Sequence, residues 1–98
     1  MAQVLALADI KGWVNQIAPM FGAEKVTLFG SYARGNQTNK SDIDLLVEFD
    51  DNASYFTVFR MEGALKDKTG KKVEVIPAPL PDDTFLEIDK EVLLYEKK

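Results

Sequence analysis

The sequence predicts an α+β fold: a small mixed β-sheet covered by helices on one face, with the polar face of the sheet left open. Two kinds of segment alternate along the chain and support this prediction. Short segments alternate apolar and polar residues, as half-buried strands do, and longer ones repeat apolar residues every three or four positions, as helices do. With 98 residues and a mass of 11.0 kDa, the chain can build one core, so we expect a single domain over residues 1–98.

The first expected helix rests on a row of apolar residues spaced for one helical face. We expect Asp9 to cap its start, Pro19 to kink or close its end and Gly22 to stop it. The residues of the face are Ile10, Trp13, Val14, Ile17 and Phe21.

A second helix is expected from about Ser54 to Thr69, with Gly70 as its stop. Four lysines at its end are typical of a solvated helix terminus, where the helix dipole favours positive charge, rather than of a nucleic-acid patch. These lysines are Lys66, Lys68, Lys71 and Lys72. The residues expected in the core are Tyr55, Val58, Met61 and Leu65 on one stripe, together with Phe56.

A third helix is expected after Asp82, Asp83 and Thr84, which would cap it. The stretch from Val92 to Tyr95 fits either the end of this helix or a short edge strand, and the sequence leaves both open.

Three strands are expected, at Lys25–Phe29, Ile43–Phe49 and Lys72–Ile76, and prolines after Ile76 end the last one. Because side chains alternate along a strand, each strand has an apolar side and a more polar side. The acids expected on the polar side are Asp42, Asp44 and Glu48 of the second strand and Glu74 of the third.

Composition excludes several kinds of chemistry. The chain has no cysteine and no histidine, so disulfides, cysteine-bound zinc and thiol catalysis are excluded, and metal binding and proton transfer fall to carboxylates. The net charge of −4 and the pI of about 4.7 argue against binding to a nucleic-acid backbone. No apolar run approaches the roughly 20 residues of a membrane span, and the first residues lack the basic start of a signal peptide, so we expect a cytoplasmic protein.

Three of the acids form a candidate metal site. Asp42 and Asp44 point to the same side of their strand, and Glu74 joins them if the second and third strands are neighbours. Carboxylates of like charge repel each other unless a cation lies between them. An oxygen-only set without histidine suits Mg²⁺ or Mn²⁺.

A glycine–serine turn upstream forms a candidate phosphate site. Gly30 and Ser31 end a strand and open a short helical turn, where backbone N–H groups and the serine hydroxyl attract anions. Arg34, in the same turn, either contacts phosphate oxygens or pairs with a surface acid, and Tyr32 either packs or stacks on a nucleotide base.

These two motifs together resemble a known signature. Gly30-Ser31, ten residues, and then Asp42-x-Asp44 is similar to the signature of the DNA polymerase β-type nucleotidyltransferases, and the flanking Arg34-Gly35 and apolar strand agree with it. The chain resembles in particular the minimal nucleotidyltransferases of prokaryotic toxin–antitoxin pairs, whose ending is similar to Leu94-Tyr95-Glu96.

The resemblance implies a nucleotidyltransferase fold and an activity. Asp42 and Asp44 would hold two Mg²⁺ ions, with Glu74 as the third acid, and Gly30 and Ser31 would hold the triphosphate of ATP. The activity implied is transfer of AMP to a hydroxyl, namely a tyrosine of a partner HEPN-domain ribonuclease toxin. The family more often has aspartate at the position of Glu74, so its role departs furthest from the pattern.

Two alternatives stay open at this stage. One is an antitoxin that acts by binding and occlusion alone, which needs neither the acids nor the glycine–serine turn. The other is a nucleotidyltransferase that modifies a small molecule of the aminoglycoside type.

Overall fold

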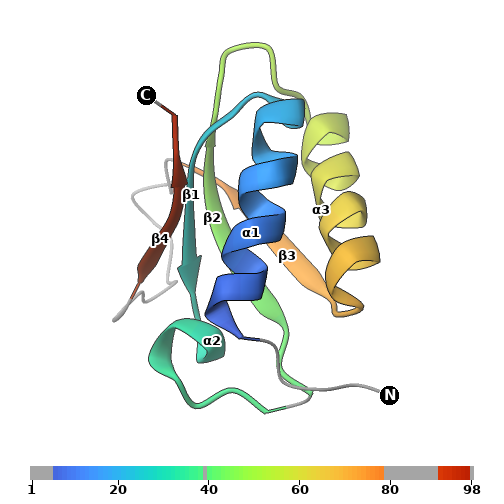
Figure 1. Ribbon diagram of the computed structural model, residues 1–98. Helices are drawn as coiled ribbons and strands as arrows, with labels where there is room; N and C mark the ends of the chain where they lie inside the picture. The colour runs from blue at the N-terminus through green and yellow to red at the C-terminus, as the bar shows by residue number, and fades with distance from the viewer. Residues whose placement is uncertain (1–5, 39, 79–90, 98) are drawn as a thin grey trace, which may run out of the picture.

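Four strands form one mixed sheet in this computed structural model, which describes residues 6–38, 40–78 and 91–97. The strand order is β3-β2-β1-β4; β1 is antiparallel to both β2 and β4, and β2 is parallel to β3. The strands are β1 (Ala23–Phe29), β2 (Ile43–Phe49), β3 (Val73–Pro77) and β4 (Val92–Glu96). Helices α1 (Leu7–Ile17) and α3 (Tyr55–Thr69) lie on the same face of the sheet (Figure 1). The predicted fold class is confirmed.

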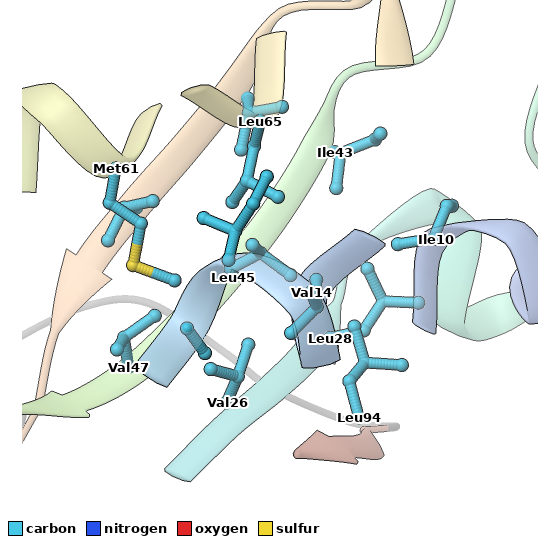
Figure 2. Packing of buried hydrophobic residues seen from close by; sticks show 14 of the residues in the cluster. Ile10, Val14, Val26, Leu28, Ile43, Leu45, Val47, Met61, Leu65 and Leu94 are labelled. Carbon is cyan, nitrogen blue, oxygen red and sulfur yellow. The ribbon is translucent and has the colours of Figure 1, made fainter. Parts of the chain in front are cut away.

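The core lies between this face and the two helices. Figure 2 shows alternate residues of the strands meeting the apolar sides of α1 and α3. Because side chains alternate along a strand, the residues between them point to the other face, which we call the far face. The labelled core residues are Ile10, Val14, Val26, Leu28, Ile43, Leu45, Val47, Met61, Leu65 and Leu94, all buried.

The first helix differs from the prediction at its start. Its N-cap residue is Ala6, so the expectation that Asp9 caps the helix is wrong. Asp9 lies in the first turn, where its negative charge interacts favourably with the positive end of the helix dipole. A short 3₁₀ helix, Ala18–Phe21, contains Pro19 and closes the element, and Gly22 ends it with a φ of 72°, as predicted.

The core expectation for α3 holds for Val58, Met61 and Leu65 but not for its first turn. Tyr55 and Phe56 are exposed, so both expectations are wrong. At about 100° per residue these two side chains lie about 120–140° around the helix from Met61, outside the stripe that meets the sheet.

Ser54 starts α3 as expected, since its backbone N–H donates to Thr57 Oγ1 at 3.1 Å in a capping box. Gly70 stops the helix as predicted, with a φ of 69°. Lys71 is buried, contrary to the expectation of a solvated lysine, because the Thr69 hydroxyl accepts the Lys71 N–H at 3.2 Å and holds the chain against the helix end.

The C-terminal stretch forms the edge strand β4, which decides between the two alternatives left open for Val92 to Tyr95. The Asn15 side chain donates to the Leu94 carbonyl at 2.8 Å and ties this strand to α1. The helix expected after Asp82 lies outside the described residues. Within the part of the chain that the structure describes, every helix is too short or too polar to cross a lipid bilayer.

Candidate active site

The far face carries a row of residues that the sheet register brings together. Asp44 lies near the start of β2, opposite Phe29 of β1 on one side and Glu74 of β3 on the other. Glu74 therefore points toward the aspartates, as predicted, rather than away from them. Asp44 is half-buried, whereas Glu74 and Asp42 are exposed, so solvent reaches this group of acids.

The electrostatics of Asp44 report on its neighbours. The pKa of Asp44 is raised above its ordinary value of 3.8, and burial is the largest cause. The negative charges of Glu74 and Asp42 follow, and then a side-chain hydrogen bond with Glu74. The positive charge of Arg34 acts in the opposite direction. The other three predicted charged site residues, Asp42, Glu74 and Arg34, are thus all close enough to affect the carboxyl group of Asp44.

Gly30 touches this carboxyl group from the end of β1. Its backbone has φ 76° and ψ −155°, a conformation that is essentially restricted to glycine. A Cβ at this position would collide with Oδ2 of Asp44 and would lie 3.3 Å from its Cγ. The absence of a side chain at Gly30 is therefore what lets the turn approach the acids.

The helical turn α2 (Ser31–Arg34) begins directly after this contact. The Gly30 carbonyl accepts the N–H groups of Ala33 and Arg34 at 3.1 and 3.0 Å, which fixes the first turn beside Asp44. The positive end of a helical turn attracts anions, so the start of α2 is where an anion could bind beside the acids. Figure 1 places α2 at the end of the sheet where β1 stops.

The acids suit a hard cation by their chemistry, because carboxylate oxygens are the ligands that Mg²⁺ prefers. Asp44 and Glu74 already meet, and their mutual repulsion is what a cation between them would relieve. Within residues 6–38, 40–78 and 91–97, however, no group of three acidic, histidine or cysteine side chains is placed to hold one ion together. The donor set fits Mg²⁺ by its chemistry; Glu74 shares a hydrogen bond with Asp44, whereas Asp42 acts on Asp44 through its charge.

Two aromatic residues near the site differ from the sequence analysis. Tyr32 has an exposed fraction of 1% and packs in the core, which decides between the two alternatives that the sequence left open for it, packing and stacking on a nucleotide base. The sequence analysis did not single out Phe29, which is buried opposite Asp44. The only sequence signal for it was its place on the same side of its strand as Thr27.

With this geometry in place, comparison with known proteins gives the family. Residues 9–97 match the nucleotidyltransferase domain family. The chain belongs to this family.

Two curated relatives of this nucleotidyltransferase domain carry names that describe an activity. A Methanocaldococcus jannaschii protein, named as an inferred protein adenylyltransferase, is 45% identical over 56 residues, which cover 57% of this chain and 57% of that protein. Protein adenylyltransferase MntA of Thermococcus cleftensis is 31% identical over 62 residues, which cover 63% of each chain. The chain therefore spans less than two thirds of the length of these two relatives.

Solved structures agree with the fold. A protein described as an inferred minimal nucleotidyltransferase is 32% identical, with a TM-score of 0.65 over 72% of each chain. A toxin–antitoxin complex with AMP-PNP matches 90% of this chain and 74% of that chain with a TM-score of 0.75, at 17% identity. A complex of tri-AMPylated Shewanella oneidensis HEPN toxin with MNT antitoxin has a TM-score of 0.64 over 90% of this chain and 71% of that chain, at 15% identity. At 17% and 15% identity, the last two show a shared fold and no more.

Proposed function

We propose that this nucleotidyltransferase domain transfers AMP from ATP to a hydroxyl group of a partner protein in a metal-dependent reaction. The observation that carries the proposal is the contact between a glycine-only turn at Gly30 and the paired acids Asp44 and Glu74. A phosphate-binding turn directly beside a carboxylate pair is what transfer of a charged phosphoryl group requires. The names of both curated relatives support the same activity.

Each site residue has a role in this proposal. Asp42, Asp44 and Glu74 would hold two Mg²⁺ ions, with Asp42 turning toward the other two when the ions bind. Bound Mg²⁺ supplies positive charge that offsets the negative charge developing on the phosphates. Ser31 and the first N–H groups of α2 would bind the triphosphate, and a complex with the ATP analogue AMP-PNP among the structural neighbours supports ATP as substrate. Arg34 would contact a phosphate oxygen.

The transfer itself forms one bond and breaks one. The acceptor hydroxyl oxygen attacks the α-phosphorus of ATP, and the bond from this phosphorus to the β-phosphate bridging oxygen breaks, which releases pyrophosphate. The hydroxyl proton would pass to a nearby base, for which we propose the exposed carboxylate of Glu74. The products are an AMP-modified acceptor, pyrophosphate and a proton.

For the acceptor we propose a tyrosine of a HEPN-domain ribonuclease toxin, so that the domain acts as the antitoxin of a toxin–antitoxin pair. The structural neighbours described as toxin–antitoxin complexes, one with an AMPylated HEPN toxin, support this choice. Such a pair would work in the cytoplasm, where ATP is available.

The test is to incubate the protein with ATP labelled at the α-phosphate, Mg²⁺ and the toxin. The wild type is expected to label the toxin, and the double variant Asp42→Asn, Asp44→Asn is expected to abolish labelling. Glu48→Gln is a matched control, because Glu48 lies on the same strand, is exposed and forms an ion pair with Lys25 at 3.9 Å. Equal labelling by the double variant would show that the acids do not act as proposed.

A binding-only antitoxin is the second candidate, favoured by the absence of an assembled three-acid group in the described part of the chain. The same double variant separates the two candidates. Occlusion predicts that it neutralises the toxin as well as the wild type does, whereas AMP transfer predicts that neutralisation is lost with labelling.

A further inference from the structure

The outer face of α3 exposes a group of large apolar side chains that the proposed reaction does not use. Tyr55, Phe56 and Phe59 are 82%, 80% and 69% exposed, and Met20 beside them is 73% exposed. Met20 and Phe56 line one surface hollow of about 370 Å³ together with Thr57. We call these four residues, Met20, Tyr55, Phe56 and Phe59, the α3 patch.

The size of the α3 patch indicates a contact surface. A large aromatic side chain contributes about 200 Å², so the three aromatic side chains and Met20, at these exposures, together present on the order of 500–600 Å² of apolar surface. This is as large as the largest patch on a typical monomer, and such patches commonly mark interaction sites. It is also a substantial part of the roughly 800 Å² that each partner contributes to a stable interface.

The charges around the patch are arranged so that the face complements itself. The chain just before α3 carries the exposed acid Asp51, and the first turn of the helix carries no acid. The last turns carry Lys66, Asp67 and Lys68, of which Lys66 lies about 20° around the helix from Phe59 and Lys68 on the opposite side. A helix of 15 residues is about 22 Å long, so the acidic and basic ends are well separated. A two-fold axis across the middle of α3 places each end beside the opposite end of a second copy.

The middle of the helix has room for such an approach. Gly63 is exposed, and a Cβ built on it meets no atom within 4 Å. It lies four residues, or about 6 Å, along the helix from Phe59. In an antiparallel pair with its axis midway between these residues, Phe59 of each copy faces Gly63 of the other, so a large side chain meets a position without one.

We propose that the domain forms a homodimer through the α3 patch, with the two α3 helices antiparallel. A second copy fits better than an unrelated protein because one face carries both the aromatic group and its small counterpart Gly63, with an acid, Asp51, before one end and a lysine, Lys66, at the other. The dimer leaves the proposed active sites accessible, because α3 lies on the covered side of the sheet and the acids lie on the far face. The proposal does not depend on the proposed function.

The first experiment measures mass by light scattering during size-exclusion chromatography over a range of concentrations up to about 100 µM, where even a weak dimer is populated. The wild type is expected at twice the chain mass of 11.0 kDa. Phe59→Glu is expected to be a monomer at every concentration. Lys11→Gln is the matched control, since it also lowers the net charge by one unit, at an exposed position of α1, and it is expected to remain a dimer. Circular dichroism checks that both variants are folded.

The second experiment tests the antiparallel arrangement. Asp51→Lys and Lys66→Asp are each expected to weaken the dimer several-fold at low salt, and the effect shrinks at high salt because exposed charges are screened. Combining both substitutions in one chain is expected to restore the dimer, since each pair then forms with its charges exchanged.

Three outcomes would overturn the proposal. A wild type that stays at 11.0 kDa at the highest concentration means that the patch serves another partner. A dimer that survives Phe59→Glu uses a different face. Charge reversals at Asp51 and Lys66 that add to each other instead of compensating exclude the antiparallel pairing.

Discussion

Replacing Gly30 by alanine separates what this residue does for stability from what it does for the site. A non-glycine residue at φ 76° and ψ −155° loses about 1–3 kcal/mol of folding free energy through backbone strain. The new Cβ also collides with Oδ2 of Asp44. A carboxylate is the far end of its side chain and can rotate away at little further loss of stability, but it then leaves its position beside Glu74. We therefore expect a moderate loss of stability and a severe loss of activity.

Two other glycines provide controls for Gly30→Ala. Gly35 has a φ of 78° and a Cβ there meets nothing within 4 Å, so Gly35→Ala adds strain without a collision. Gly12 lies in the helix α1, has no positive φ, and a Cβ there also meets nothing within 4 Å. Gly12→Ala therefore adds neither backbone strain nor a collision and is expected to stabilise the helix by about 0.5–1 kcal/mol.

The assays are urea unfolding and transfer of labelled AMP to the toxin. Gly30→Ala is expected to lower the free energy of unfolding by about 1–3 kcal/mol and the rate of transfer about a hundredfold, the scale of a misplacement by 1 Å. Gly35→Ala is expected to lose about 1–2 kcal/mol and to keep its rate. If Gly30→Ala transfers AMP as fast as Gly35→Ala, the turn and the carboxylate do not cooperate and the reasoning is refuted.

Three further predictions concern the acids. Asp44→Asn is expected to raise the free energy of unfolding at pH 7. In the wild type the pKa of Asp44 is raised in the folded state, so the stability falls as the pH rises from about 3.8 through that raised pKa. Denaturation at several pH values should show that this fall is absent from the variant. Glu74→Gln removes a negative neighbour and is expected to lower the pKa of Asp44 toward its ordinary value, although burial keeps part of the shift, as carboxyl ¹³C NMR titration can measure. The Glu62 carboxylate accepts the N–H of Val75, on the edge strand β3, at 2.8 Å. In urea unfolding, Glu62→Ala is expected to lower the free energy of unfolding by about 1.5–3 kcal/mol, and Glu62→Gln, which keeps an acceptor, is expected to lower it less. Equal losses would mean that the hydrogen bond contributes nothing.

The strands were predictable because alternation leaves little freedom. The segment Ile43–Phe49 has apolar residues at every odd position, and the structure gives β2 these same bounds. The side on which Asp44 lies follows directly from that alternation. The side of Glu74 was predictable in the same way, from Val73 and Val75 on either side of it.

The neighbours of a strand were not predictable in this way. Nothing in the spacing between Asp44 and Glu74 says that β2 and β3 pair in parallel, because that pairing depends on how α3 packs between them in the chain. The same limit explains why Phe56 was expected in the core although it is exposed. Periodicity distinguishes the sides of a helix, but whether a given side is buried depends on which other element packs against it. An exposed aromatic side was therefore assigned to the core.

The site depends on two independent strand registers that meet at one residue. Asp44 faces Phe29 only because β1 and β2 are paired as they are, and it faces Glu74 only because of the separate pairing of β2 with β3. A slip of one residue in either pairing would turn one neighbour to the opposite face of the sheet.

Both irregularities recorded in the pairing of β1 lie away from this row. One is between Ala23 and Lys25, at the start of the strand, and the other is between Val26 and Thr27, where β1 pairs with β4 rather than with β2. The ladder from Lys25 to Phe29 against β2 is therefore unbroken up to Asp44. Since the Gly30 turn starts one residue after Phe29, the same ladder that places the acid also places the turn, which is why a chain of this size can bring both to one point.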